Sequence, residues 1–297
     1  MKTLKDLLFD PYLMILLKGE PDSGKTEFIS HFPFPMLYLD FDGKAHSLAR
    51  NLIKRGIGLD DKRYIDYRFF SRNDLDKFDQ LVEELIDNKG RNYATVACDS
   101  LTTIATHSVD FFSKHTPLSK KEKSGQSDRI IRGIKLPGFT EYGGEFKVLN
   151  VLIEMFMALE CHRILTAHIV AGDKPEWQRQ VVTAGKKPAA MLPAVFPEIY
   201  HLETNKSGDP EGDNEYIVRT KSTGSDFARS SMQCKSTFDW TNKNVFEILT
   251  TIAARTGRNL KQGIMPKREE QTSEEGNPVS VESSLNPKPE SEPVLNS

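Results

Sequence analysis

The chain has 297 residues, of which 38% are hydrophobic, and its formal net charge is -2. A chain of this length and apolar content can bury one large core and still carry short appendages. The near-neutral charge argues against a protein that coats duplex nucleic acid through bulk charge alone.

Cysteine spacing and hydropathy indicate a reducing, intracellular compartment. The three cysteines are far apart, so they suggest neither a disulfide framework nor a paired-cysteine metal site. The longest uninterrupted apolar run, residues 12–17, is far shorter than the roughly 20 residues that cross a bilayer. Asp6 and Asp10 also lie where a signal peptide would have its apolar segment. We therefore expect a cytoplasmic protein without a membrane-spanning segment.

Strand-like and helical patterns alternate along the chain. Continuous apolar runs predict buried strands at residues 13–17, 36–39, 64–70, 93–98 and 163–170. Apolar residues at helical spacing predict helices over residues 75–86 and 144–160. This alternation predicts an α/β fold in which helices sandwich a mainly parallel sheet.

The pattern changes after residue 170. Short apolar runs between glycine, proline and aspartate turns predict a C-terminal antiparallel extension of the sheet, at residues 180–183, 199–203 and 216–220. A last helix is expected over residues 245–255. Residues 263–297 are rich in Glu, Ser, Pro and Asn and lack periodicity, so we expect a disordered acidic tail after one folded domain, residues 1–262.

The segment after the first strand has the pattern of a phosphate-binding loop (P-loop). Its sequence, Gly19-Glu20-Pro21-Asp22-Ser23-Gly24-Lys25-Thr26, fits GxxxxGK[ST] without exception. In such loops backbone amides converge on the phosphates, the lysine reaches the outer phosphates, and the hydroxyl binds Mg²⁺. The motif requires a preceding strand and a following helix, and both are expected here. We therefore predict ATP and Mg²⁺ as ligands, with Lys25 also acting in catalysis.

Acidic residues follow two of the predicted strands. Asp99 ends the strand at residues 93–98, where it can hold Mg²⁺ through the water shell of the ion. Hydrolysis also needs a group that orients and deprotonates the attacking water. Asp40 and Asp42 follow the strand at residues 36–39, and alternation places both on one side. We assign the base to Asp42, nearer the strand end; the alternative is that both are solvated turn carboxylates.

The strand at residues 163–170 carries Thr166 and His168 at the same edge of the predicted sheet. A polar side chain there could sense whether the triphosphate is intact and move the loop behind it. We assign this role to His168 or Thr166, with a purely structural strand-end histidine as the alternative. A metal role for His168 with His162 is disfavoured because no cluster of other ligands accompanies them.

Two cation-rich segments suit a single-stranded nucleic acid. Seven Lys and Arg stand against two acidic residues between Lys114 and Lys135, and a second segment, residues 171–190, contains Trp177. Lysines can meet the phosphates while bases stack on the aromatic ring. The candidate DNA-binding residues are Lys120, Lys121, Lys123, Arg129, Arg132, Trp177, Lys186 and Lys187. Solvated basic loops without a ligand are the alternative.

Three further cations lie on or after the predicted extension. Arg219, Lys221 and Arg229 could reach a nucleotide held by an adjacent subunit, as arginine fingers do. The protein would then be a homo-oligomer with nucleotide sites between subunits. Ordinary surface charges are an equally good interpretation.

The P-loop, the acidic second strand and the Asp99 strand, in this order, resemble the core of RecA-type ATPases. More narrowly, the chain is similar to phage AAA-domain nucleotide-binding proteins, which include RecA-like single-strand annealing proteins of the Sak class. The closer likeness covers about residues 12–230 and rests on residues 19–26, 37–43, 96–100 and 164–168, on Glu141-Tyr142-Gly143, and on Gly185-Lys186 before Leu192-Pro193.

This resemblance implies ATP binding and, for the Sak class, annealing of single-stranded DNA during phage recombination in the host cytoplasm. RecA-like proteins usually have a glutamate as catalytic base on the second strand. The matching residue here is Asp42, one methylene shorter, so slow hydrolysis is expected.

The sequence therefore favours a single-stranded-DNA-dependent ATPase that promotes strand annealing in DNA recombination. One alternative is a nucleotide-switched adaptor or loader for a single-strand-binding or other replication protein, with the acidic tail as docking element. A small-molecule P-loop kinase is a further alternative, although the sequence has no evident arginine-rich lid.

Overall fold

The computed structural model describes residues 10–61, 63–115, 130–131, 134–135, 139–170, 180–183, 191–192, 194–205, 214–223 and 227–264. All of them lie in one unit, Met1–Lys267. The strands of its large sheet are β1 (Met14–Gly19), β2 (Met36–Asp40), β3 (Ile65–Phe69), β4 (Thr95–Asp99), β7 (His162–Val170), β8 (Gln180–Val181), β9 (Glu198–Asn205), β10 (Glu215–Arg219) and β11 (Thr237–Asp239). A separate two-stranded sheet pairs β5 (Ile130–Ile131) with β6 (Ile134–Lys135).

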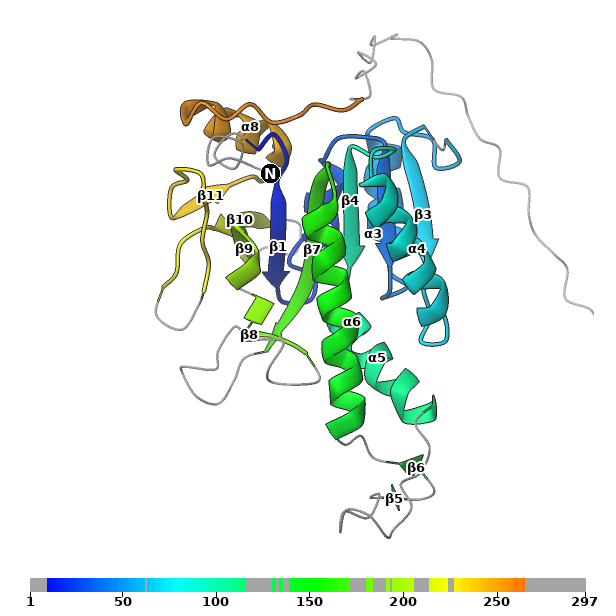
Figure 1. The fold of residues 1–297 in the computed structure, drawn as a ribbon. Coiled ribbons are helices and arrows are strands. Elements are labelled where there is room, and N and C mark those ends of the chain that lie inside the picture. The colour runs from blue at the N-terminus through cyan, green and yellow to red at the C-terminus, as the bar shows by residue number, and fades with distance from the viewer. Residues whose placement is uncertain are drawn as a thin grey trace, which may run out of the picture. The chain divides into compact units, whose positions relative to one another are not determined.

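The large sheet has the P-loop strand near its middle (Figure 1). Its strands follow the order β11-β10-β9-β1-β7-β4-β2-β3, and β8 pairs with β7. The six strands from β9 to β3 are parallel, so the carboxyl ends of β1, β2, β4 and β7 meet at one edge. Every residue of β1, β2 and β4 is buried. This explains why these strands have continuous apolar sequences, since helices cover both faces of the sheet.

Two helical layers enclose the sheet. Helices α2 (Lys25–Ser30), α3 (His46–Lys54) and α8 (Val245–Arg255) contribute to one core, and α4 (Leu75–Asn88), α5 (Leu101–His115) and α6 (Phe139–Ala158) contribute to the other. Neighbouring residues of β1 divide between the two cores. Ile15 and Leu17 pack with the first group of helices, whereas Leu16 packs with the second. The predicted α/β fold, in which helices sandwich a mainly parallel sheet, is thus confirmed.

The C-terminal extension is antiparallel only in part. β10 and β11 are antiparallel, and β8 is antiparallel to β7, in agreement with the sequence. β9 joins the two parts of the sheet, because it pairs antiparallel with β10 and parallel with β1. The predicted antiparallel extension is therefore confirmed, and the parallel pairing of its first strand with the P-loop strand is an addition to it. A short apolar run between turns predicts a strand but leaves its direction open, and here burial beside the P-loop strand gives β9 a central place.

The last described residues pack against the core. Ile264 pairs antiparallel with Phe34 through two backbone hydrogen bonds, so Gly263 and Ile264, assigned to the tail by sequence, continue the folded part. Residues 265–297 lie outside the described residues, and the disordered tail stays a prediction there. Among the helices that the structure describes, none is both long and apolar enough to span a bilayer.

Candidate nucleotide-binding site

The segment from Gly19 to Thr26 forms a tight turn between β1 and α2. Gly19 ends β1 beside β9, where a Cβ would overlap the Ser23 hydroxyl and lie 2.9 Å from the Leu202 carbonyl oxygen. Gly24 caps α2 with a φ of 84°, which L side chains rarely adopt. The curl of this loop therefore requires glycine at both positions.

Lys25 is held inside the loop at the first turn of α2, with 6% of its surface exposed. Its Nζ donates to the carbonyl oxygens of Gly19 at 3.1 Å and of Glu20 at 2.6 Å. Burial lowers the pKa of this lysine to about 8, although Asp99 and Asp42 favour its charged form. Phosphate oxygens would be stronger, charged acceptors for the same ammonium group. The lysine is thus placed for the outer phosphates of a nucleotide.

Three hydroxyl groups converge on the buried carboxylate of Asp99. Thr26 Oγ1 donates to Oδ2 at 3.1 Å, the Tyr38 hydroxyl donates to the same oxygen at 2.6 Å, and Thr166 donates to Oδ1. The two predicted metal positions, Thr26 and Asp99, are therefore in direct contact. Such oxygen ligands suit Mg²⁺, which keeps several waters and binds substrate phosphates as well as one or two protein groups. Within the described ranges, no three or more His, Cys, Asp and Glu side chains are grouped so that they could hold a metal ion by themselves.

Tyr38 is a site residue that the sequence did not reveal. Its ring is fully buried in β2, and burial raises the pKa of its hydroxyl well above the usual value, so the hydroxyl stays a donor. Within an apolar run, a tyrosine predicts core packing. Tyr38 pairs with Ala97 across β2 and β4, and strand alternation then places it on the same side of the sheet as Asp99. The pairing register of β2 and β4, which the sequence does not show, is the signal that would have identified Tyr38.

Asp40 and Asp42 have different hydrogen-bond partners in the structure. Asp40 is 1% exposed, and its carboxylate accepts from the Gly43 backbone N at 2.8 Å and from the Tyr67 hydroxyl at 3.0 Å. Burial raises the pKa of Asp40, although these hydrogen bonds oppose the rise. Asp40 therefore stabilises the turn after β2.

Asp42 instead faces the ends of β4 and β7. Its Oδ1 accepts from Ser100 Oγ at 2.8 Å and from the Thr103 hydroxyl, and its Oδ2 lies 3.3 Å from His168 Nε2. Burial opposes ionisation, but the hydrogen bonds from His168, Thr103 and Ser100 outweigh it and lower the pKa of Asp42 to about 2. Of the two candidates, Asp42 is the carboxylate that contacts groups following β4 and on β7, at the edge where the P-loop strand also ends.

His168 and Thr166 lie at the same edge as the P-loop. His168 is paired with Gly19 in the β1–β7 register, and its backbone N donates to Thr102 Oγ1 at 3.0 Å. Thr166 contacts Asp99, as described above. The two candidate sensor residues therefore touch the two acidic positions, Asp42 and Asp99.

The predicted DNA-binding residues cannot be placed. Lys120, Lys121, Lys123, Arg129, Arg132, Trp177, Lys186 and Lys187 all lie outside the described residues. Their assignment to DNA stays a prediction.

The three candidate trans-acting cations lie in different surroundings. Arg219 forms a two-pronged ion pair with Glu203, at 2.8 and 2.9 Å, beside the P-loop of its own chain. Arg229 Nε donates to the Phe196 carbonyl oxygen at 2.8 Å and so supports the segment before β9. Lys221 is exposed. Any action of Arg219 or Arg229 on another subunit would first require release from these contacts.

A polar cleft of about 390 Å³ lies beside the P-loop. Residues 20–23 form one wall, and residues 201–205 of β9, with Arg219, form the other. The parallel pairing of β9 with β1 creates this wall, since β9 continues past the end of β1. The cleft adds room for a ligand that reaches beyond the loop itself.

Two aromatic rings support the other side of the loop. The Tyr216 ring lies 3.0 Å from the position that a Cβ of Gly24 would take, and its centroid is 5.2 Å from that of the buried Trp240. These residues come from β10 and from the turn after β11, so no local sequence pattern indicates their contact with the P-loop. The loop is thus packed against an aromatic pair.

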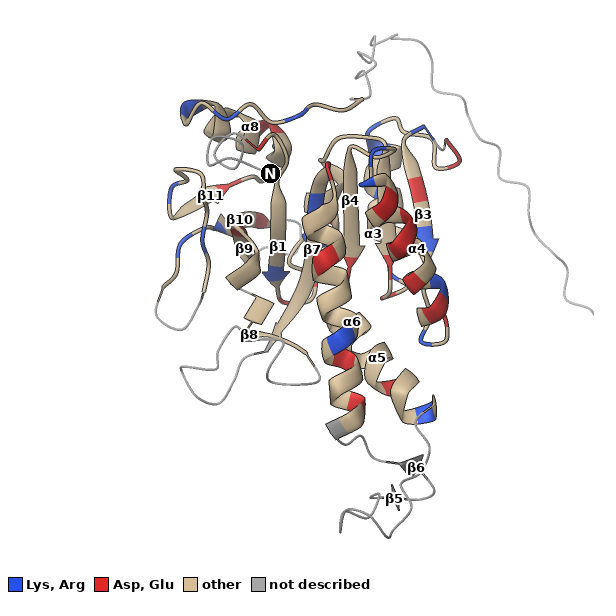
Figure 2. Ribbon diagram, viewed as in Figure 1, with Lys and Arg blue, Asp and Glu red and all other residues tan. Residues whose placement is uncertain are grey.

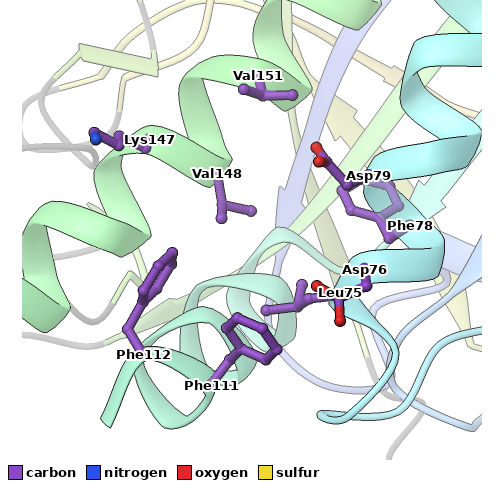
Figure 3. A pocket seen from close by; sticks show the side chains of 9 residues that line it. All are labelled: Leu75, Asp76, Phe78, Asp79, Phe111, Phe112, Lys147, Val148 and Val151. Atoms are coloured by element: carbon purple, nitrogen blue, oxygen red, sulfur yellow. The ribbon is translucent and has the colours of Figure 1, made fainter. Parts of the chain in front are cut away.

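A second cavity, of about 210 Å³, lies between α4, α5 and α6 (Figure 3). Its lining is mostly apolar, with Phe111 and Phe112 opposite Val148 and Val151. Asp76 and Asp79 line its α4 side, and further acidic residues follow along that helix (Figure 2). No P-loop residue lines this cavity.

Comparison with known proteins gives little beyond the fold. No protein-family model matches the sequence, and no curated protein matches it. Among solved structures, the chain is similar to a KaiC-like protein from the hyperthermophilic archaeon Pyrococcus horikoshii OT3, with 13% sequence identity and a TM-score of 0.45. That likeness covers 76% of this chain and 84% of the archaeal one. The function is therefore argued from the site itself.

Proposed function

We propose that this chain binds ATP with Mg²⁺ and hydrolyses its terminal phosphate. The observation that carries the proposal is the convergence of Lys25, Thr26 and Asp99 where β1 and β4 end at one edge of the sheet. A motif can occur by chance in a sequence. A buried lysine inside a glycine-dependent turn, with a hydroxyl and a carboxylate in contact beside it, matches the chemistry of a metal-bound triphosphate.

In this proposal some residues of the site bind the nucleotide and others take part in the reaction. Backbone amides of the loop would hold the phosphates, and Lys25 would neutralise charge on the outer ones. Thr26 and Asp99 would hold Mg²⁺, which supplies charge neutralisation at the phosphate oxygens when bound. Asp42 and His168 lie across the same edge, where an attacking water would need to be oriented.

We also propose that single-stranded DNA accelerates this hydrolysis and that the protein promotes strand annealing. Two features support this proposal: the positive charge of the two cation-rich segments, and their place in the chain directly after α5 and β7, which carry residues of the site. Residues 116–135 follow α5, whose Thr102 and Thr103 contact His168 and Asp42, and residues 171–190 follow His168 on β7. DNA held by these segments would therefore be linked through the chain to groups at the nucleotide edge.

ATP turnover with and without single-stranded DNA tests this proposal. We expect a saturable rise in the rate with DNA, and reversal of Lys120, Lys121 and Lys123 to glutamate should weaken DNA binding and reduce its salt dependence. Reversal of Lys54, Lys77 and Lys235, exposed lysines outside both segments, is the charge-matched control. A flat response to DNA in an active ATPase would exclude the DNA-dependent function and leave nucleotide hydrolysis standing.

A further inference from the structure

Asp42 and His168 form a hydrogen-bonded pair beside the P-loop. His168 Nε2 lies 3.3 Å from Asp42 Oδ2, and both side chains are largely buried. The β1–β7 register places His168 level with Gly19, where the P-loop begins. The pair comes from two strand ends that are separated in the sheet by β4, so only the folded chain brings it together.

Asp42 is poorly suited to take a proton from water. Both of its oxygens already accept hydrogen bonds, from Ser100 and Thr103 on one side and from His168 on the other. A general base works best when its pKa lies near the operating pH. The network around Asp42 stabilises the carboxylate, which weakens it as a base and makes it a good partner for a cation.

His168 has the complementary properties. Its backbone is fixed by the Thr102 hydroxyl, and one ring nitrogen is held by Asp42. The other ring nitrogen, Nδ1, is buried and has no hydrogen-bond partner among the described residues. A buried polar atom without a partner in the protein needs an explanation, and a hydrogen bond to water or to a substrate atom is one.

From this geometry we infer that His168 is the general base of ATP hydrolysis and that Asp42 is its positioning residue. The inference rests on the proposed ATPase function and moves the role of base, which the sequence suggested for Asp42, to His168. A carboxylate that accepts from one imidazole nitrogen fixes the tautomer and leaves the lone pair of the other nitrogen for proton transfer.

In the reaction, His168 Nδ1 takes a proton from water while the water oxygen forms a bond to the γ-phosphorus. The bond between the γ-phosphorus and its bridging oxygen breaks, and ADP leaves with that electron pair. Asp42 stabilises the imidazolium that results, and His168 then loses the proton to solvent or phosphate.

His107 on α5 is the competing histidine. Its Nδ1 also lacks a partner among the described residues, and burial lowers its pKa although Asp110 and Asp42 oppose this. Its ring, however, is only partly buried and lies 6.4 Å from that of Phe41. It is therefore the matched control for a histidine near Asp42 that takes no part in the reaction.

The test compares His168→Gln, Asp42→Asn and His107→Gln in the full chain. Glutamine can keep a donor near the Nε2 position, and so preserve the contact with Asp42, but it cannot act as a base. We expect His168→Gln to bind Mg-ATP like the wild type and to lose roughly 10²- to 10⁴-fold in kcat, the usual contribution of a general base. Asp42→Asn should also lower kcat, and His107→Gln should leave it within about 2-fold.

The pH profile gives a readout that a structural role would not move. The groups at this edge are Asp42, Asp99, Lys25 and His107 besides His168 itself. With His168 as base, the acid limb of the wild-type kcat profile is absent from the residual activity of His168→Gln and persists in His107→Gln. A carboxylate base with a pKa of about 2 would give no fall between pH 5 and 7.

Two results would overturn the inference and are distinct from failure of the proposed function. Near-wild-type turnover in His168→Gln would exclude His168 as base, and an acid limb of the kcat profile that persists unchanged in His168→Gln would show that another group is the base. A wild-type chain that binds Mg-ATP without any turnover would overturn both the inference and the assigned hydrolysis. A folded wild type that does not bind Mg-ATP would remove the proposed function itself.

Discussion

The Tyr38 hydroxyl donates a hydrogen bond of 2.6 Å to Asp99, the carboxylate that also contacts the last residue of the P-loop. Two neighbouring parallel strands thus hold between them the carboxylate that we propose as a Mg²⁺ ligand. The bond lies wholly inside the protein, because Tyr38 is fully buried.

Removing this hydroxyl should weaken metal binding without destroying the fold. A hydrogen bond to a charged group is worth about 1.5–3 kcal/mol, so Tyr38→Phe should raise the Mg²⁺ concentration needed for half-maximal ATP binding by roughly 10-fold or more. The matched control is Tyr64→Phe, because the Tyr64 ring packs edge-on against Phe34; this variant should behave like the wild type. Equal Mg²⁺ dependence of Tyr38→Phe and the wild type would show that Asp99 needs no such support.

The close approach of β9 to Gly19 predicts a sharp difference between two glycine substitutions. Gly19→Ala would push its Cβ against Ser23 and the Leu202 carbonyl oxygen, so nucleotide binding should be lost and the melting temperature lowered. Gly143→Ala meets nothing within 4 Å on an exposed turn of α6, and should stabilise the protein by roughly 0.5–1 kcal/mol. Nucleotide titration and thermal unfolding measure both effects. Normal ATP binding by Gly19→Ala would contradict the described loop.

The buried His162 and the half-buried His31 predict loss of stability in acid. His162 Nδ1 accepts from the Leu13 backbone N and His31 Nδ1 accepts from the Val245 backbone N, and burial lowers the pKa of each to about 4. Between about pH 6.5 and 4 the unfolded chain binds more protons than the folded one. The free energy of unfolding therefore falls as pH falls through this window, by roughly 3 kcal/mol for each histidine.

Denaturant unfolding at several pH values checks this prediction. Asparagine can offer an acceptor near the Nδ1 position without titrating, so the His31→Asn and His162→Asn variants should each show a shallower decline between pH 6.5 and 4. The wild type provides the reference curve. An unchanged pH dependence in the double variant would mean that these histidines are not neutral in the folded state.

The aromatic pair beside the loop predicts a spectroscopic signal. The chain has two tryptophans, Trp177 and Trp240, and Trp240 packs on Tyr216, which in turn lies against Gly24. In a Trp177→Phe background, Mg-ATP should change the Trp240 emission in a saturable way, because ordering of the P-loop shifts Tyr216. Adding Lys25→Ala should abolish the change. If calorimetry detects Mg-ATP binding while the Trp240 emission stays unchanged, the loop and the aromatic pair move independently.

Much of this fold could be predicted from sequence because burial on both sides leaves continuous apolar runs. The strands β1, β2, β3, β4 and β7 and the helices α4, α6 and α8 all fall within a few residues of the predicted segments, apart from an earlier start of α6. The P-loop could be found because its spacing encodes one backbone shape. What sequence could not supply were relationships across strands, such as the parallel direction of β9.

In the site, too, the sequence predicted some features and not others. Asp42 and Asp40 have equivalent places in the sequence, and only Ser100, Thr103 and His168 distinguish them, through contacts made by other strands and by α5. Tyr38 resembled a core residue until its partner Asp99 was known. Local pattern thus predicted which residue types meet at the edge, and tertiary pairing decided which of them bond to each other.

Calorimetric titration of the folded full-length chain with Mg-ATP tests the central claim most directly. We predict saturable uptake of one nucleotide per chain by the wild type and none by Lys25→Ala, with thermal unfolding showing that both proteins are folded. No uptake by the wild type at millimolar Mg-ATP, or equal uptake by the two proteins, would contradict the assignment of residues 19–26 as a nucleotide site.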